Sequence, residues 1–143
     1  MSLSEVRDFN FSTDYEAVLR LWQDAGEGIQ LRRSDEADEI LKKLQRDPDL
    51  FLVIENDRAE IIGAVFAGFD GRRGMMYHLA VEKTHRKMGV ASILVEELEN
   101  RLREKGCIRY YLLVTPENRD AIHFYENRDW EKLDLLVYGK DLE

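Results

Sequence analysis

Cysteine and long apolar runs are scarce in this sequence of 143 residues. Its single cysteine, Cys107, excludes a disulfide within the chain and a zinc site built from several thiolates. The opening residues, Met-Ser-Leu-Ser-Glu-Val-Arg, lack the basic start and apolar core of a signal peptide. The longest apolar stretch, Ile61 to Phe69, is far shorter than the ~20 residues that a membrane-spanning helix needs. We therefore expect a cytoplasmic protein with no membrane partner.

Basic residues are outnumbered by acidic ones, 21 Lys and Arg against 29 Asp and Glu, which gives a net charge of −8. Binding to a phosphate backbone depends largely on Lys and Arg. This balance argues against a nucleic-acid partner and is compatible with cationic ones. Proline is rare at two residues, and 44% of the chain is hydrophobic, which is typical of a soluble globular protein. The length suits one domain, and we predict a single domain over residues 1–143.

The first half of the chain is expected to form a short strand, two helices and three antiparallel strands. Thr13 and Glu16 have the spacing of a capping box, which predicts that the first helix opens at Thr13 and ends before Gly26. Ser34 is a candidate cap for the second helix, which Asp47 and the proline after it should stop. The expected strands are Val6–Phe9, Leu50–Glu55, Ile61–Phe69 and Met75–Val81.

The second half of the chain predicts a parallel crossover. The longest helix is expected from about Gly89 to Lys105 and is followed by a strand at Ile108–Val114. A further helix should follow Asn118, and Trp130–Leu142 should form one or two strands. The strands have apolar residues at consecutive positions, so helices should cover both faces of the sheet. The predicted fold is α/β, with a mixed, mostly antiparallel sheet and one parallel strand–helix–strand unit.

The segment from Val81 to Ala91 combines the features of an anion site. A strand ends, the basic residues Arg86 and Lys87 follow, and Gly89 opens the longest helix. The first N–H groups of a helix lack partners within it and attract phosphate groups. On this segment alone a second interpretation is equally good, in which Gly89 serves a tight turn and the two cations are solvated.

This segment and a later one resemble the two signatures of the GNAT superfamily of acyl-CoA-dependent N-acyltransferases. The first signature corresponds to Leu79-Ala80-Val81 followed by Arg86-Lys87-Met88-Gly89-Val90-Ala91. The second corresponds to Asn118-Arg119-Asp120-Ala121-Ile122-His123-Phe124-Tyr125-Glu126. It departs from the family at its end, where Asp129-Trp130 replaces a Gly-aromatic pair. The order of predicted elements also matches, so the resemblance covers nearly the whole chain and is strongest to small single-domain bacterial members.

The resemblance implies a role for each part of the two motifs. The loop from Arg86 to Ala91 would bind the coenzyme A pyrophosphate through its N–H groups, and the strand edge at Leu79 and Val81 would pair with the pantetheine arm. Asn118 would bind the same arm, and Tyr125 would protonate the leaving thiolate. A core aromatic is the alternative role for Tyr125. The implied coenzyme A site comprises Leu79, Ala80, Val81, Arg86, Lys87, Met88, Gly89, Val90, Ala91 and Asn118, with no metal.

No residue is identified from the sequence as the base that deprotonates the amine. Leu112 and Leu113 lie where some family members carry a Glu, and Met75 and Tyr77 lie where others carry acidic or His residues. Strand alternation favours a packed role for His78, unless a bulge shifts the register. Deprotonation through ordered water is the other alternative.

The function that the resemblance implies is acetyl transfer from acetyl-CoA to a primary amine by direct attack in a ternary complex. Cys107 lies at the wrong end of its predicted strand for a covalent route. The alternative is a non-catalytic acyl-CoA-binding or sensing module of the same fold. Residues 26–33 and the second helix should shape the acceptor pocket, and the partners expected are acetyl-CoA and the amine acceptor. We expect a monomer or a homodimer.

Overall fold

A computed structural model describes residues 3–143, and the chain divides into two compact units. The first unit ends at Leu113 and contains the sheet with three helices of more than one turn. The second unit, Val114–Glu143, contains helix α4 (Arg119–Glu126) as the one regular element among its residues. The single domain over residues 1–143 stays a prediction, and each unit is described by itself.

The sheet of the first unit has five strands in the order β1-β2-β3-β4-β5. The first four strands pair antiparallel with their neighbours, and β4 pairs parallel with β5. The mixed, mostly antiparallel sheet predicted from the sequence is thereby confirmed. The strands are β1 (Leu3–Asp8), β2 (Phe51–Asn56), β3 (Ile61–Phe69), β4 (Arg73–Val81) and β5 (Arg109–Tyr111).

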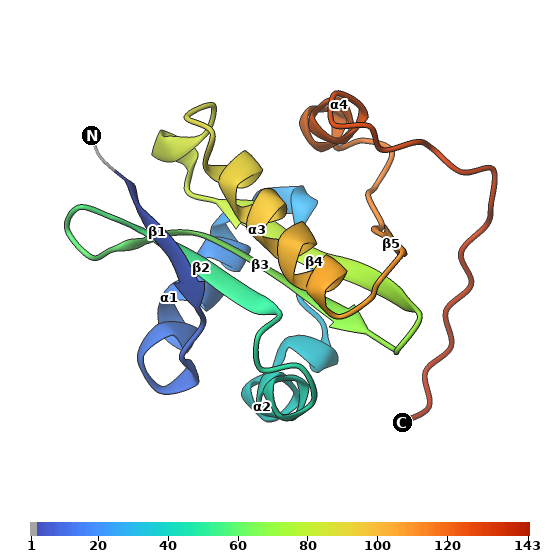
Figure 1. Ribbon diagram of the computed structural model, residues 1–143, viewed down its shortest axis with the longest axis horizontal. Coiled ribbons are helices and arrows are strands. Elements are labelled where there is room, and N and C mark those ends of the chain that lie inside the picture. The colour runs from blue at the N-terminus through green and yellow to red at the C-terminus, as the bar shows by residue number, and fades with distance from the viewer. Residues whose placement is uncertain (1–2) are drawn as a thin grey trace. The chain divides into compact units, whose positions relative to one another are not determined.

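Helices cover both faces of this sheet, as predicted. Helices α1 (Phe11–Asp24) and α2 (Ala37–Arg46) contribute Trp22 and Ile40 to one hydrophobic core, which also includes Val53 and Ala64 of the central strands. Helix α3 (Val90–Glu104) packs on the other face, where a Cβ added at Gly63 would contact Val90 and Leu94. Figure 1 shows α1 behind the sheet and α3 in front of it. Side chains alternate between faces along a strand, so β2 and β3 are buried on both sides.

Short 3₁₀ helices connect these elements. They are η1 (Gly26–Gly28), η2 (Arg33–Asp35) and η3 (Lys83–His85). The first two lie in the α1–α2 connection, and the third lies between β4 and α3.

Both predicted helix caps were wrong. Helix α1 begins two residues before Thr13, and its cap is Asn10, whose Oδ1 accepts from the backbone N–H of Ser12 at 3.1 Å. Asn10 prevails because its extended backbone and short side chain suit the position that precedes a helix. Ser34 lies within η2, and α2 begins after Glu36 without a side-chain cap.

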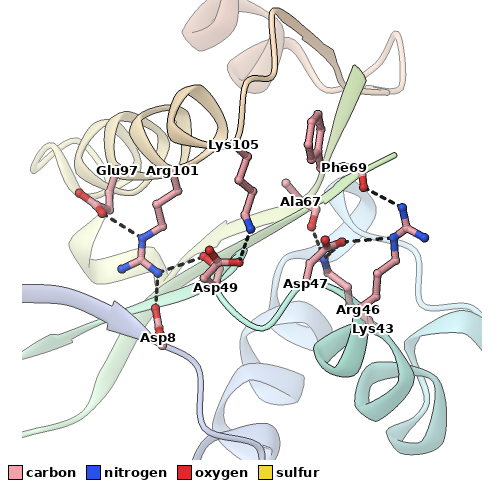
Figure 2. Close-up of polar contacts among 10 residues, drawn as sticks. All are labelled: Asp8, Lys43, Arg46, Asp47, Asp49, Ala67, Phe69, Glu97, Arg101 and Lys105. Carbon is pink, nitrogen blue, oxygen red and sulfur yellow. Dashed lines mark hydrogen bonds and ion pairs between the residues drawn. The ribbon is translucent and has the colours of Figure 1, made fainter. Parts of the chain in front are cut away.

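Basic side chains fasten the helices to strand ends (Figure 2). Lys43 of α2 pairs with Asp47 at 3.0 Å and donates to the carbonyl of Ala67, which lies where β3 extends past the start of β2. On the other face, Arg101 of α3 pairs with Asp8 at the end of β1 and donates to the carbonyl of Asp49. These contacts supply donors to carbonyl groups that the sheet leaves without strand partners.

The later strands differ from the prediction. The strand expected at Ile108–Val114 is confined to Arg109–Tyr111, and the strands expected at Trp130–Leu142 are absent from the described chain. Residues 131–143 are exposed, and their β-branched and aromatic residues lack the neighbouring strand that a ladder of hydrogen bonds requires. None of the helices in the described part of the chain has the length and apolar character needed to cross a membrane.

Candidate active site

The start of α3 has the geometry expected of an anion site. Gly89 precedes the helix with φ 82°, in the left-handed region that favours glycine, and no side chain within residues 3–143 caps this helix end. A Cβ built at Gly89 would find no atom within 4 Å, so the space beside its backbone is open. The N–H groups of the first turn lack partners within the helix and form the positive end of its dipole. A phosphate fits this arrangement.

The basic residues of the β4–α3 loop lie beside this helix start. Arg86 donates from Nε to the carbonyl of Val81 at 3.1 Å, which folds the loop back on the end of β4. Lys87 has φ 66°, an uncommon conformation for a residue with a side chain. The loop therefore takes a defined path, with left-handed residues at positions 87 and 89.

One edge of β4 is open over its second half. Strand β5 pairs only with Arg73, Gly74 and Met75, and no later residue of β4 has a strand partner on this edge in the described part of the first unit. The N–H of Glu82 bonds to Ile62 of β3 at 2.8 Å. Because backbone groups alternate in direction along a strand, those of Leu79 and Val81 are directed to the open edge. The sequence motif named the same two residues.

A β-bulge interrupts β4 at His78 and Leu79. The pairing with β3 shifts between Ala64↔Ala80 and Phe66↔Tyr77, so two residues of β4 lie opposite Val65. His78 takes φ 44° at this point, in the left-handed region. As a result, Tyr77 and His78, which are adjacent in sequence, both contact the ring of Phe66. Tyr77 stacks on it at a centroid distance of 5.2 Å, and His78 meets it edge-on at 5.6 Å. The register shift that would move His78 off the strand face expected from simple alternation is therefore present.

His78 is paired with a buried carboxylate that the sequence reasoning missed. Its Nε2 lies 2.8 Å from Oδ1 of Asp35, which is only 6% exposed. Asp35 also accepts from the backbone N–H of Arg32 at 3.0 Å, and its own carbonyl accepts from the hydroxyl of Tyr15 at 3.1 Å. Trp22 packs edge-on against His78 at 5.1 Å. Asp35 lies in a connection without periodicity, so no pattern in the sequence marks it as a partner of β4.

Asn118, in the second unit, caps helix α4. Its Oδ1 accepts from the backbone N–H of Ala121 at 3.3 Å. This contact gives Asn118 a structural role at the helix start. The side-chain NH₂ group, which donates, is not used in that contact.

Tyr125 packs among aromatic side chains within the same unit. Its ring meets Phe124 edge-on at 5.3 Å and Trp130 at 5.6 Å. The backbone N–H of Trp130 also bonds to the carbonyl of Tyr125 at 3.2 Å. Burial raises the pKa of Tyr125 to about 12. The hydroxyl therefore stays protonated throughout the neutral range, as a proton donor must.

Comparisons with known proteins agree with the signatures in the sequence. Residues 15–130 match the family model described as the acetyltransferase (GNAT) family. An acetyltransferase of Pectobacterium atrosepticum is 40% identical over 140 residues, which cover 96% of this chain and 95% of that protein.

Solved structures share the fold at lower identity. An acetyltransferase of the GNAT family from Staphylococcus aureus superposes with a TM-score of 0.78 at 18% identity, covering 99% of this chain and 94% of that one. AAC(6')-Iy, solved with the bisubstrate analogue CoA-S-monomethyl-acetylneamine, superposes with a TM-score of 0.76 at 19% identity, with 99% of each chain covered.

Proposed function

Because the chain belongs to the GNAT acetyltransferase family, we propose that it transfers the acetyl group of acetyl-CoA to a primary amine of a small molecule or a protein. The amine attacks directly, in a ternary complex. One observation carries this proposal: the open edge of β4 leads, through η3 and the loop after it, to the start of α3, which has no side-chain cap among the described residues and has free space beside Gly89. A ligand with an extended amide-bearing arm and a pyrophosphate suits both features.

The coenzyme A portion is assigned to the loop and the open edge. The N–H groups from Lys87 to Ala91 hold the pyrophosphate at the positive end of α3. Backbone groups of Leu79 and the N–H of Val81, whose carbonyl accepts from Arg86 Nε, pair with the amides of the pantetheine arm, as an added strand would. The family signature assigns the side-chain NH₂ of Asn118 to the same arm.

Tyr125 is assigned as the proton donor to the leaving sulfur. Acetyl-CoA supplies a thioester, whose thiolate leaves more easily when it accepts a hydrogen bond. A phenol with a pKa of about 12 is a weak acid toward a thiol with an ordinary pKa of ~8.5. Full transfer of the Tyr125 proton to sulfur therefore requires that the buried surroundings of Tyr125 also raise the pKa of the thiol. Until the proton is transferred, the hydrogen bond from Tyr125 stabilises the negative charge on the departing sulfur.

Substitutions at Gly89 test the binding site. Gly89→Glu places a carboxylate where the pyrophosphate is assigned, so acetyl-CoA affinity measured by calorimetry should fall by about 100-fold or more. Gly89→Ala is the matched control, because it introduces a side chain at the same positive φ without the charge or reach. Equal affinities for the two variants and the natural chain would refute the site.

Tyr125→Phe separates an enzyme from a non-catalytic acyl-CoA-binding module. The substitution removes the hydroxyl and keeps the ring against Phe124 and Trp130. If Tyr125 is the acid, turnover with a panel of amines should fall roughly 10²–10⁴-fold while acetyl-CoA affinity is unchanged. A natural chain that binds acetyl-CoA and acetylates no amine would favour the binding module.

A further inference from the structure

The side chains of His78 and Asp35 are held by more specific contacts than a histidine that only fills space in the core would need. His78 sits at the bulge with an uncommon left-handed backbone, and conformations of this kind cluster at functional sites. Its partner Asp35 comes from a connection that is distant in sequence and is fixed in turn by Arg32 and Tyr15. The ring is thus held from two sides, by a buried carboxylate and by the aromatic rings of Trp22 and Phe66.

This contact determines which ring nitrogen of His78 can accept a proton. A carboxylate accepts hydrogen bonds and donates none, so Nε2 must carry the hydrogen that Asp35 Oδ1 receives. The lone pair of the neutral ring is then on Nδ1. No hydrogen bond occupies Nδ1 in the part of the chain that the structure describes. The side chain of His78 is 19% exposed, so the ring is not sealed from a ligand.

His78 also lies next to the open edge of β4 that is assigned to the pantetheine arm. Leu79, the next residue, directs its backbone to that open edge, and the bulge gives the two residues one opposing partner on β3. The His78–Asp35 pair therefore lies beside the part of β4 whose outer edge is open. An amine that attacks a thioester placed along this edge would come close to the His78 ring.

We propose that Nδ1 of His78 accepts the proton that the attacking amine must lose, and that Asp35 is the positioning residue that fixes the ring. This inference rests on the proposed acetyl transfer. An ammonium group gives one proton to Nδ1, and its nitrogen then forms the bond to the acetyl carbon while the electron pair of the carbon–sulfur bond leaves with sulfur. The nitrogen loses a second proton as it becomes an amide nitrogen and the leaving sulfur takes up one, so the products are the amide, the free thiol and the proton held by His78. The imidazolium that results is stabilised by Asp35 and releases its proton to water after the amide leaves.

Three variants test this role in the full chain, with release of free thiol from acetyl-CoA as the readout. His78→Asn keeps a residue that tolerates positive φ and removes the imidazole. His78→Gly fits the same backbone and leaves room for added imidazole. Asp35→Asn retains the shape of the carboxylate but offers a donor toward Nε2, which favours the wrong ring tautomer. His123→Gln, at an exposed histidine of α4, is the matched control.

With an alkylamine that the natural chain acetylates, kcat/KM of His78→Asn and Asp35→Asn should fall roughly 10²-fold or more. Acetyl-CoA affinity and His123→Gln activity should be unchanged. Added imidazole should restore a measurable part of the activity of His78→Gly. O-methylhydroxylamine, an amine that is unprotonated at neutral pH, should lose less than about tenfold in His78→Asn, because it needs no base before attack.

The pH profile supplies a readout that a structural role would not change. The acidic limb of kcat/KM should disappear in His78→Asn. Among the described residues, the recorded contacts of the His78 ring are with the carboxylate of Asp35 from η2 and with the uncharged rings of Trp22 and Phe66. Tyr15 of α1 reaches only the carbonyl of Asp35.

The outcomes separate this inference from the proposed function. If the natural chain acetylates amines and folded His78→Asn retains its rate and acidic limb, the base assignment is overturned and acetyl transfer stands. If the natural chain binds acetyl-CoA and acetylates none of the amines, acetyl transfer fails and this inference fails with it. Loss of rate in His78→Asn with no rescue of His78→Gly by imidazole, and with equal losses for both kinds of amine, would also overturn it.

Discussion

A substitution at Gly63 tests how closely the sheet and helix α3 are packed near the β4–α3 loop. A Cβ at this position would lie 2.9 Å from Leu94 Cδ1, 3.0 Å from Val90 Cγ1 and 3.1 Å from Ile54 Cγ2. Ordinary contacts between carbon atoms are ~3.5–4.0 Å, so all three neighbours must retreat in Gly63→Ala. These side chains are at most 1% exposed, so they cannot retreat into solvent.

The expected cost follows from two opposing effects. Overpacking of a well-filled core destabilises by about 1–3 kcal/mol. Replacing glycine by alanine lowers the entropy of the unfolded chain, which returns about 0.4–1 kcal/mol where the backbone tolerates a side chain. We expect a net loss of about 1–2 kcal/mol in the free energy of unfolding of Gly63→Ala, measured by urea denaturation.

Gly68→Ala on the same strand is the matched control. Its Cβ would find only Tyr77 Cε2 at 3.8 Å, an ordinary contact, so this variant should be as stable as the natural chain or slightly more stable. Gly63→Ala combined with Val90→Ala should be less unstable than the sum of the two single losses, because the second change removes one of the clashing methyl groups. Equal stabilities of Gly63→Ala and Gly68→Ala would refute the reasoning.

Two ion pairs give further predictions. Lys43→Met should lower the free energy of unfolding by about 3 kcal/mol in urea, because it strips the close partner from the buried carboxylate of Asp47, whereas exposed Arg46→Met should cost under about 1 kcal/mol. Burial opposes ionisation of Asp14, but hydrogen bonds from Arg7 and from backbone N–H outweigh it and lower the pKa of Asp14. The pair therefore stabilises the fold above the unfolded pKa of ~3.9, and this contribution is lost as the pH falls through the folded pKa. Asp14→Asn should flatten that part of the acid denaturation curve, and an unchanged curve would contradict the assignment.

The sequence predicted those elements whose signals are local. Strands β2 and β3 are continuous β-branched and aromatic runs, and both lie within a residue or two of the expected ranges. Helix α3 begins directly after Gly89, as the position of that glycine predicted. The pairs Glu97–Arg101 and Glu99–Arg103 also form at helical spacing, at 2.9 Å and 3.5 Å. Each of these features depends on residues close together in the chain.

The predictions that failed concern choices between competing local signals. Asn10 and Thr13 are both good helix caps, and periodicity alone does not rank them. The run from Leu133 to Tyr138 has strand composition, yet a strand needs a neighbour, and composition does not supply one.

The bulge in β4 shows why the candidate base was the hardest residue to assign from sequence. Alternation along β4 placed His78 and Tyr77 on opposite faces, and one extra residue opposite Val65 removes that distinction. The bulge has no signature here, because His78 takes a positive φ without being a glycine. Its contact with Asp35 joins residues 43 positions apart, across a connection without periodicity. A motif reports residues that contact a ligand shared by a whole family, whereas a pair of this kind depends on how this particular α1–α2 connection folds. That difference explains why the motifs propose acetyl-CoA ligands residue by residue, whereas they assign no residue as the base that deprotonates the amine.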